Sequence, residues 1–229
     1  LRRQRQMCIR DRRGIIFDLD GTLLDTLASL ASAFNRALIE LNHPVHPVSE
    51  YRHIIGDGAR TAALRALPPG SRNDSEVEKC LQLFREDYDE SWHEATIYKD
   101  ITNTLCTLKE QLPLAVLSNK DDLFTQRCIE YFFPNRFTLV VGASSTILHK
   151  PDTSGALHIA ARLGTTTDQL WMIGDTSTDM LTAQRSGMVG VGVLWGFRNR
   201  EELENNGANH ILGSPRELLE LYNAYKMNG

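Results

Sequence analysis

The sequence lacks the segments expected of a membrane protein or of a disulfide-rich secreted domain. No apolar run approaches the roughly 18–20 residues that a membrane-spanning helix needs. Four cysteines are present, at Cys8, Cys80, Cys106 and Cys128, but they are widely spaced and include no CxxC pair. Neither a disulfide framework nor a thiolate metal site is therefore indicated, and we expect a cytoplasmic protein with reduced thiols.

Basic residues are too few overall to favour a nucleic acid as the partner. The formal net charge is −4, and six arginines with a single aspartate are concentrated in residues 1–13. The rest of the chain is thus more acidic than the whole, which argues against nucleic-acid binding by the folded part. Residues 1–13 have no apolar core of a signal peptide and precede an abrupt apolar run. We expect them to be a disordered or non-native leader outside the fold.

Internal repeats, low-complexity segments and a dinucleotide-binding fingerprint are also missing; Gly187, Gly190 and Gly192 do not have the spacing of that fingerprint. The composition is that of an ordinary globular protein, with 229 residues of which 41% are hydrophobic and 24% charged. A chain of this length can bury one sizeable core and carry a smaller accessory domain.

Short apolar runs alternate with helical stretches over most of the chain. Residues 14–18 predict a buried strand that ends in a carboxylate. Further strands are predicted at 112–117, 137–141, 170–173 and 189–194, and helices at 121–132, 153–163 and 177–186. This alternation favours βαβ units, a parallel sheet and an α/β fold. In such sheets, ligands bind beyond the carboxyl ends of the strands.

One long stretch, from Thr26 to about Trp92, has helical pattern and no convincing strand. Apolar residues between Leu27 and Leu41 recur at helical spacing. Residues 58–67 and 75–92 are also expected to be helical. A helical insert directly after the first strand suggests a separate cap with hinges near residues 22–26 and 93–100. We expect the cap to span 25–94 and the α/β core to span 14–24 and 95–229.

Four polar clusters fall at the ends of predicted strands. Asp18 and Asp20 leave the first strand, and Gly21 permits a turn that brings both carboxylates to one place. Ser118-Asn119-Lys120 closes a second strand, and Lys150-Pro151 follows a third. The segment 174–179 follows a fourth and contains Asp175 and Asp179. Because these clusters would meet at one edge of the sheet, they are candidates for a single site.

Several carboxylates at one rim would repel each other strongly in a partly dry cleft. A hard divalent cation relieves that repulsion, and ligation by oxygen alone favours Mg²⁺ over zinc. A cation, a lysine and a hydroxyl donor around one point can cradle a phosphate dianion. One aspartate could then attack phosphorus, while the other passes a proton to the leaving oxygen and later takes one from water.

The four motifs, FDLDGTL at 17–23, SN at 118–119, KP at 150–151 and GDTSTD at 174–179, resemble in this order those of the haloacid dehalogenase superfamily of phosphohydrolases. The resemblance covers roughly residues 14–222. It implies a Rossmann-like parallel sheet core flanked by helices, with a small all-helical cap inserted after the first strand. It also implies a magnesium cofactor.

Carried over by position, the resemblance makes Asp18 the nucleophile and a magnesium ligand. Asp20 would be the general acid and base, with its backbone carbonyl also on the metal. Lys150 would balance charge between nucleophile and phosphate, and Asp175 would bind magnesium. Asp179 would lie in the first or second shell of the metal. Phosphate contacts are implied for Ser118, with Asn119 beside it, and for Gly21 and Thr22 in the first motif.

Within the superfamily the chain is most similar to phosphoglycolate phosphatases. The turn Gly56-Asp57-Gly58 would open a cap helix and direct its amide groups and positive dipole end toward an anion. Arg60 or Arg65 on that helix could pair with a substrate carboxylate. Asp57 departs from the asparagine more usual there, and a carboxylate at this place would discourage an anionic substrate.

The expected partner is a small phosphorylated metabolite rather than a nucleic acid or a membrane, and we expect a monomer or homodimer. Phosphoglycolate is the leading substrate, with nucleotides, pyrophosphate and sugar phosphates as alternatives. A phosphomutase would use the same aspartyl-phosphate but return the phosphoryl group to the sugar. A binding protein on an inactive scaffold would lack a catalytic residue, yet Asp18, Asp20, Lys150 and Asp175 are all present.

Overall fold

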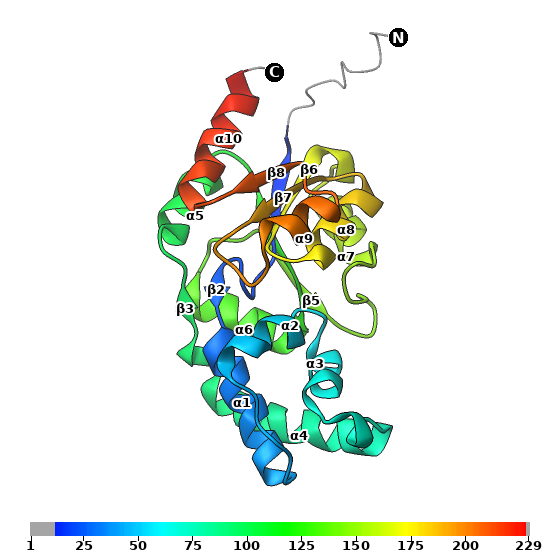
Figure 1. The fold of residues 1–229 in the computed structure, drawn as a ribbon. Helices are drawn as coiled ribbons and strands as arrows, with labels where there is room; N and C mark the ends of the chain where they lie inside the picture. Colours follow the sequence, from blue (N-terminus) through cyan, green and yellow to red (C-terminus); the bar gives the residue numbers. More distant parts are fainter. Residues whose placement is uncertain (1–11, 228–229) are drawn as a thin grey trace.

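A computed structural model of the chain describes residues 12–227. Its centre is a six-stranded sheet in the order β5-β4-β1-β6-β7-β8, in which every neighbouring pair is parallel. β1 therefore lies in the middle, between β4 and β6 (Figure 1). The strands are β1 (Gly14–Phe17), β4 (Leu114–Asp121), β5 (Leu139–Ala143), β6 (Leu170–Gly174), β7 (Val189–Val193) and β8 (His210–Leu212).

Helices cover both faces of this sheet. Successive residues of β1 point to opposite faces, so that Ile15 and Phe17 belong to one apolar cluster and Ile16 to another. The first cluster is completed by α5 (Ile101–Lys109), α6 (Asp122–Phe132) and α10 (Pro215–Met227). The second is completed by α7 (Ser154–Arg162) and α8 (Ser177–Ser186), while α9 (Arg200–Asn205) packs beside α8, β7 and β8.

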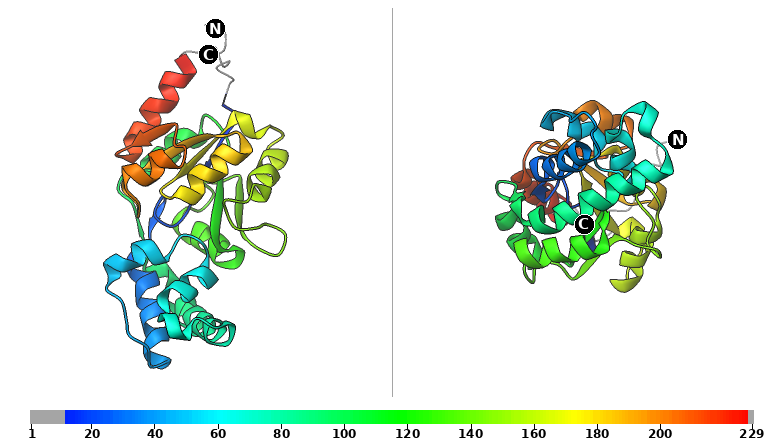
Figure 2. Two further views of the ribbon diagram at one scale, coloured as in Figure 1. Left: turned by 45° about the vertical axis from the view of Figure 1, so that its right-hand side comes forward. Right: turned by 90° about the horizontal axis from the view of Figure 1, so that it is seen from below.

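A separate helical unit follows β1 and lies beyond the end of the sheet, as two further views show (Figure 2). It has its own apolar cluster, in which Phe34, Phe84 and Tyr88 stack on one another. A two-stranded antiparallel ribbon, β2 (Leu24–Asp25) with β3 (Thr96–Ile97), joins both connections to the core. The helices of this helical unit are α1 (Leu27–Glu40), α2 (Tyr51–Ile54), α3 (Ala59–Ala66) and α4 (Asp74–Ser91).

The α/β fold with an inserted helical cap is confirmed. The division at residues 25 and 94 stays our proposal, and the β2–β3 ribbon lies close to both proposed boundaries. β4 continues four residues past the predicted strand end, through Ser118, Asn119 and Lys120. The short strand β8 and helices α5, α9 and α10 were not among the predicted elements.

The proposed leader lies mostly outside the described residues, but its last two residues do not. The backbone N–H of Arg13 donates to the carbonyl of Gln169, and Arg12 donates to the carbonyl of Asp168. Arg12 also lies over the ring of Tyr225. The core therefore begins before Gly14. In the part of the chain that the structure describes, no helix has the length and apolarity to cross a membrane.

Candidate active site

The loop after β1 brings the first motif to the sheet edge that the cap covers. Gly21 has a φ of 86°, a value that favours glycine, and a Cβ there would lie 2.4 Å from an oxygen of Asp175. The first and fourth motifs thus touch at Gly21. The hydroxyl of Thr22 donates to Asp175 Oδ1 at 3.1 Å. Its side chain holds that carboxylate in place, and the phosphate contact of Thr22 stays a prediction.

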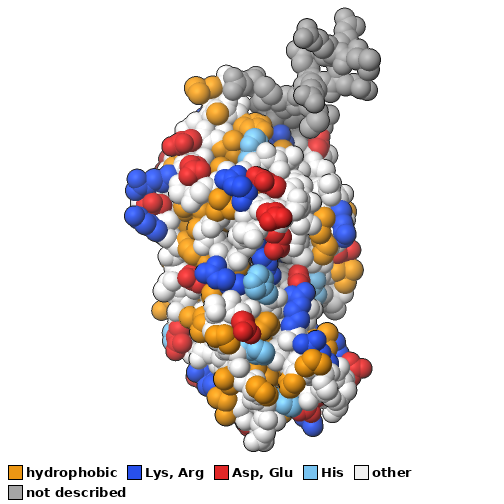
Figure 3. Space-filling model, viewed as in Figure 1, with side chains coloured by type: hydrophobic (Ala, Val, Ile, Leu, Met, Phe, Trp, Pro, Cys, Tyr) orange, Lys and Arg blue, Asp and Glu red, His pale blue; other side chains and the backbone are white. Residues whose placement is uncertain are grey.

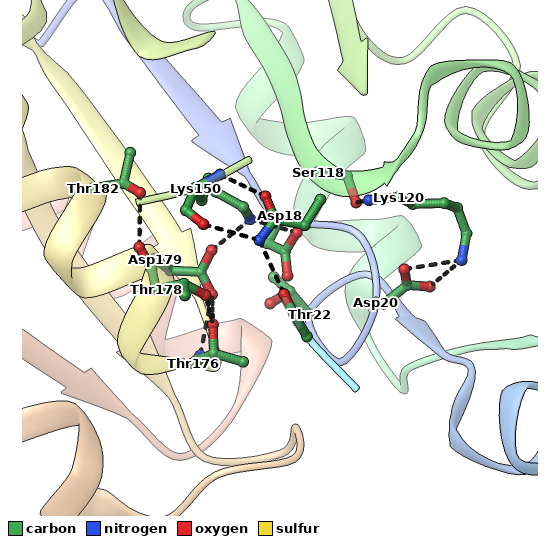
Figure 4. Close-up of polar contacts among 12 residues, drawn as sticks. Asp18, Asp20, Thr22, Ser118, Lys120, Lys150, Thr176, Thr178, Asp179 and Thr182 are labelled. Atoms are coloured by element: carbon green, nitrogen blue, oxygen red, sulfur yellow. Dashed lines mark hydrogen bonds and ion pairs between the residues drawn. The ribbon is translucent and has the colours of Figure 1, made fainter. Parts of the chain in front are cut away.

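Three carboxylates converge at the ends of the central strands. One carboxylate oxygen from each of Asp18, Asp175 and Asp179 lies within 4.8 Å of the other two. The Nζ of Lys150 bridges two of them, at 2.7 Å from Asp18 Oδ1 and 2.6 Å from Asp179 Oδ1 (Figure 4). All four residues are buried. The three carboxylates and one ammonium carry a net charge of −2 when fully ionised, which matches a single divalent cation.

The electrostatics of this cluster reflect burial without enough positive charge. Burial raises the pKa of Asp18 well above its ordinary value; Lys150 opposes the shift, whereas Asp179 and Asp175 add to it. Burial, followed by repulsion from Asp179, raises the pKa of Asp175 to about 7. Burial lowers the pKa of Lys150, but the neighbouring carboxylates of Asp179 and Asp18 outweigh it and the net pKa is raised. The lysine therefore stays protonated.

Asp179 is placed by the local structure at the start of α8. Its Oδ2 accepts from the backbone N–H of Thr176 at 3.1 Å and from the Thr176 hydroxyl at 2.7 Å. A carboxylate three residues after the N-cap that reaches back to the N-cap N–H is half of a capping box. Since its other oxygen receives Lys150, Asp179 is well placed to orient that lysine. Asp175 is held by Thr22 and by the N–H of Phe197, at 2.7 Å.

Asn119 connects three parts of the site. Its Oδ1 accepts from the backbone N–H of Lys150 at 2.6 Å, and its Nδ2 donates to the Lys150 carbonyl at 3.2 Å. The same Nδ2 donates to the carbonyl of Gly56 in the cap at 3.0 Å. Asn119 thus fixes the backbone of Lys150 and ties the cap to the core. Its neighbour Ser118 is buried, and both residues line a cleft between core and cap.

The side chain of Asp20 points away from the carboxylate cluster. Its two oxygens lie 3.0 and 2.9 Å from the Nζ of Lys120, which comes from the end of β4 (Figure 4). Burial lowers the pKa of Lys120, but the charge of Asp20 outweighs burial and the pKa is raised. The two carboxylates of the first motif therefore have separate lysine partners.

A cleft between core and cap opens onto Asp18 and Asp20. The cap contributes mainly apolar side chains, and the glycines of the Gly56-Asp57-Gly58 turn also line it. Asp57 itself does not line the cleft; it pairs with Arg65 at 2.5 Å. Arg60 pairs with Asp74 and Glu78 on the outside of the cap. The structure therefore engages both candidate arginines with cap carboxylates and brings neither to the cleft.

The residues at the sheet edge suit a hard divalent cation. The donors are all carboxylate oxygens, which hard cations prefer, and they are buried with a deficit of positive charge. Asp18 and Asp175 would hold the ion, and Asp179 would support it through its contacts with Lys150 and Thr176. The backbone carbonyl of Asp20 stays a proposed ligand.

The fold and site together describe a capped α/β enzyme with an acidic edge at its sheet. The family described as haloacid dehalogenase-like hydrolase matches residues 15–193. A phosphoglycolate phosphatase from Pseudomonas putida is 30% identical over 213 residues, which cover 90% of this chain and 78% of the relative. One from Colwellia psychrerythraea is 29% identical over 221 residues, with coverages of 93% and 98%.

Solved structures agree in fold. A structure from Lactobacillus delbrueckii subsp. bulgaricus has a TM-score of 0.87 at 28% identity, covering 93% of this chain and 98% of the other. A haloacid dehalogenase-like family protein from Streptococcus pneumoniae has a TM-score of 0.85 at 25% identity, with coverages of 92% and 98%. The chain belongs to the haloacid dehalogenase-like hydrolases.

The sequence does not indicate the roles of two contributors to the site. Lys120 stands in the SNK motif, but its pairing with Asp20, 100 positions away, leaves no local signal. Phe197 follows Gly196 in a loop after β7. Its backbone N–H donates to Asp175, whereas its ring packs in the apolar cluster of the cap. Gly196 lies so close to Asp175 that a Cβ at this position would be 2.4 Å from the Asp175 Cβ. The glycine itself is thus the sequence signal for a close backbone approach in this loop.

Proposed function

We propose that this hydrolase is a magnesium-dependent phosphatase that acts on a small phosphate monoester through an aspartyl-phosphate on Asp18. The observation that carries the proposal is the buried bridge of Lys150 between Asp18 and Asp179, next to Asp175, with Asp18 lining the cleft. Relatives named phosphoglycolate phosphatase make phosphoglycolate the leading substrate.

In the first half of the reaction, an oxygen of Asp18 attacks phosphorus while the bond to the ester oxygen breaks. Lys150 holds Asp18 and offsets charge on the incoming phosphate, and Ser118 at the cleft supplies a hydroxyl donor. Asp20 gives a proton to the departing oxygen. A bound magnesium ion would supply further neutralisation of the phosphate charge.

In the second half, water replaces the alcohol in the cleft. Asp20, now a carboxylate, takes a proton from this water as the water attacks the phosphorus of the aspartyl-phosphate. Asp18 leaves as a carboxylate and inorganic phosphate is released. The apolar wall of the cap favours this order of steps because it limits the access of other water molecules to the intermediate.

A phosphomutase would need to hold a second phosphate in the cap. Among the described residues that line the cleft, the cap contributes no Lys or Arg, and Arg60 and Arg65 are engaged by cap carboxylates. The cleft therefore favours hydrolysis of a substrate with one phosphate.

The direct test is kcat/KM over a panel of phosphoglycolate, nucleotides, pyrophosphate and hexose phosphates, with magnesium and with EDTA. We expect turnover with magnesium and none with EDTA. Asp18→Asn should lower kcat by at least about 10⁴-fold, because an amide does not attack phosphorus. Asp74→Asn, on the exposed side of the cap, is the matched control. Metal-independent turnover, or an active Asp18→Asn variant, would refute the proposal.

A further inference from the structure

Lys120 is a cation in the wall of the cleft, whereas the buried Lys150 does not line it. Among the described residues that line the cleft, Lys120 is the only Lys, Arg or His. Its side chain is 7% exposed. The Nζ lies 4.9 Å from the centre of the Tyr88 ring, so that α4 of the cap covers it. The hydroxyl of Tyr88 is buried there and makes no hydrogen bond of normal geometry with the described residues.

Other cations near the cap face different partners. Arg60 and Arg65 engage cap carboxylates, and Arg85 of α4 pairs with Asp121 at 2.8 Å across the cap–core boundary. Asp121 also lines the cleft, so this rim is already neutralised by Arg85. The remaining lining on the cap side is largely hydrocarbon, from Leu30, Phe34, Ile55, Ala59, Ala62 and Phe84. Arg198 lies beside Gly56 and His149 beside Gly58, but neither lines the cleft. Among the described residues that line the cleft, Lys120 is therefore the cation that an anionic group on the substrate can meet.

The position of Lys120 also sets where that anion must be. In the proposed function, Asp20 lies within about 3 Å of the ester oxygen when it transfers the proton. The Nζ of Lys120 lies a further 2.9 Å from Asp20 Oδ2. A carboxylate joined to the ester oxygen through one CH₂ group places its own oxygens about 3 Å from that ester oxygen. These lengths allow the carboxylate to approach the ammonium to the length of an ordinary charge-assisted hydrogen bond, about 2.8 Å.

We propose that Lys120 determines specificity by binding a carboxylate on the leaving group, one carbon removed from the ester oxygen. An ammonium has three N–H donors, so it can turn from Asp20 to the incoming carboxylate. Asp20 is then free to face the ester oxygen. This inference rests on the proposed phosphatase function and deepens it, since it assigns the substrate class to a residue of the core rather than to an arginine of the cap.

The test compares phosphoglycolate with carbamoylmethyl phosphate, in which a neutral amide replaces the carboxylate at nearly the same size. The wild-type enzyme should favour phosphoglycolate by about 10- to 100-fold in kcat/KM, the range expected for a charge-assisted hydrogen bond. Lys120→Met keeps an unbranched side chain that is one atom shorter, and it removes the charge. It should abolish most of this preference, mainly through a higher KM for phosphoglycolate. Lys79→Met, on the exposed face of α4, removes one positive charge elsewhere and should leave kcat/KM unchanged for both substrates.

Equal losses for both substrates in Lys120→Met would overturn the inference, because Lys120 would then act only by holding Asp20. An unchanged preference would overturn it as well. If Lys120→Met does not fold, the wild-type comparison still decides, since equal kcat/KM for the two esters contradicts the inference. Turnover of the amide ester without a preference would leave the phosphatase proposal standing. Turnover of neither these esters nor the wider panel would remove the phosphatase proposal itself.

Discussion

Among single residues, the distribution of charge around Asp18 has the largest consequences. Lys150 bridges the buried carboxylates of Asp18 and Asp179, and the third buried carboxylate, that of Asp175, lies close to both. The side chains that fix them, Thr22 and Thr176, are buried hydroxyl donors that reach the carboxylates from different loops. A site with this balance should be more stable when a divalent cation is bound.

Metal binding and pH should therefore be coupled. The pKa of Asp175 is raised from 3.8 to about 7, so the metal-free folded protein keeps a proton that the unfolded chain releases. This contribution to stability is complete at low pH and is lost as pH rises through about 7. In EDTA, Tm should fall between about pH 5 and about pH 8, and Mg²⁺ should raise Tm more at the higher pH. An equal Mg²⁺ effect at both values would contradict this charge balance.

The sequence identified the acidic residues of the site but not the pairing of its cations. Asp18, Asp175 and Asp179 follow predicted strands, and strand ends of a parallel sheet meet at one edge, so their convergence could be predicted. Arg60, Arg65 and Lys120 have long side chains, each of which can reach several carboxylates. Local pattern does not encode that choice, and the expectation that an arginine of α3 faces the substrate is not what the structure shows.

At the level of elements, the site is built from strand ends and the first turns that follow them. The start of α8 illustrates this, because Asp179 both closes the helix terminus and receives Lys150. The sequence predicts the long helices α1 and α4 close to their observed bounds, but it does not predict α10, which has 13 residues. β2 and β3 have two residues each and β8 has three, which is too short for a periodic signal, so they were not predicted.

Removing the hydroxyl of Thr176 should affect both the stability of the start of α8 and the orientation of Lys150 by Asp179. Thr176→Val keeps the side-chain shape and removes the donor to Asp179. Loss of such a contact at a helix N-terminus costs about 1 kcal/mol of stability, and a less fixed Asp179 should also lower kcat. Asn73→Ala removes the N-cap of α4, whose side chain accepts from the N–H of Glu76. It should cost similar stability, measured by urea unfolding, with kcat unchanged; a parallel loss of kcat in both variants would contradict the assignment.

Over the whole molecule, cap and core are joined by contacts of two kinds. Polar contacts cross the boundary, including Arg52 to the carbonyl of Gly196 and Arg198 to the carbonyl of Ile55, both at 3.1 Å. Phe124 and Phe197 come from core segments but belong to the apolar cluster of the cap. On the face seen in Figure 3, acidic and basic side chains of the described residues are interspersed, without an extended basic surface. The cytoplasmic location, the monomer or homodimer and the absence of a nucleic-acid partner stay predictions.

Phe197 should connect cap docking to catalysis. Phe197→Ala removes a ring that is 5% exposed and packs into the cap cluster, and we expect a loss of about 3 kcal/mol together with a raised KM. Phe133→Ala removes a residue that is 2% exposed and belongs to the core cluster and not to the cap cluster. It should lower stability by a similar amount with KM unchanged. Identical KM values for the two variants would show that the Phe197 ring does not place the cap.

The most direct measurement of the central claim is the site of phosphorylation during turnover. Asp20→Asn with p-nitrophenyl phosphate should accumulate the intermediate, because this leaving group needs little help from an acid whereas hydrolysis of the intermediate needs the base. After an acid quench, mass spectrometry of the peptides should find one phosphoryl group on Asp18. An unmodified Asp18 in a variant that still releases p-nitrophenol, or a phosphoryl group on another residue, would contradict the mechanism.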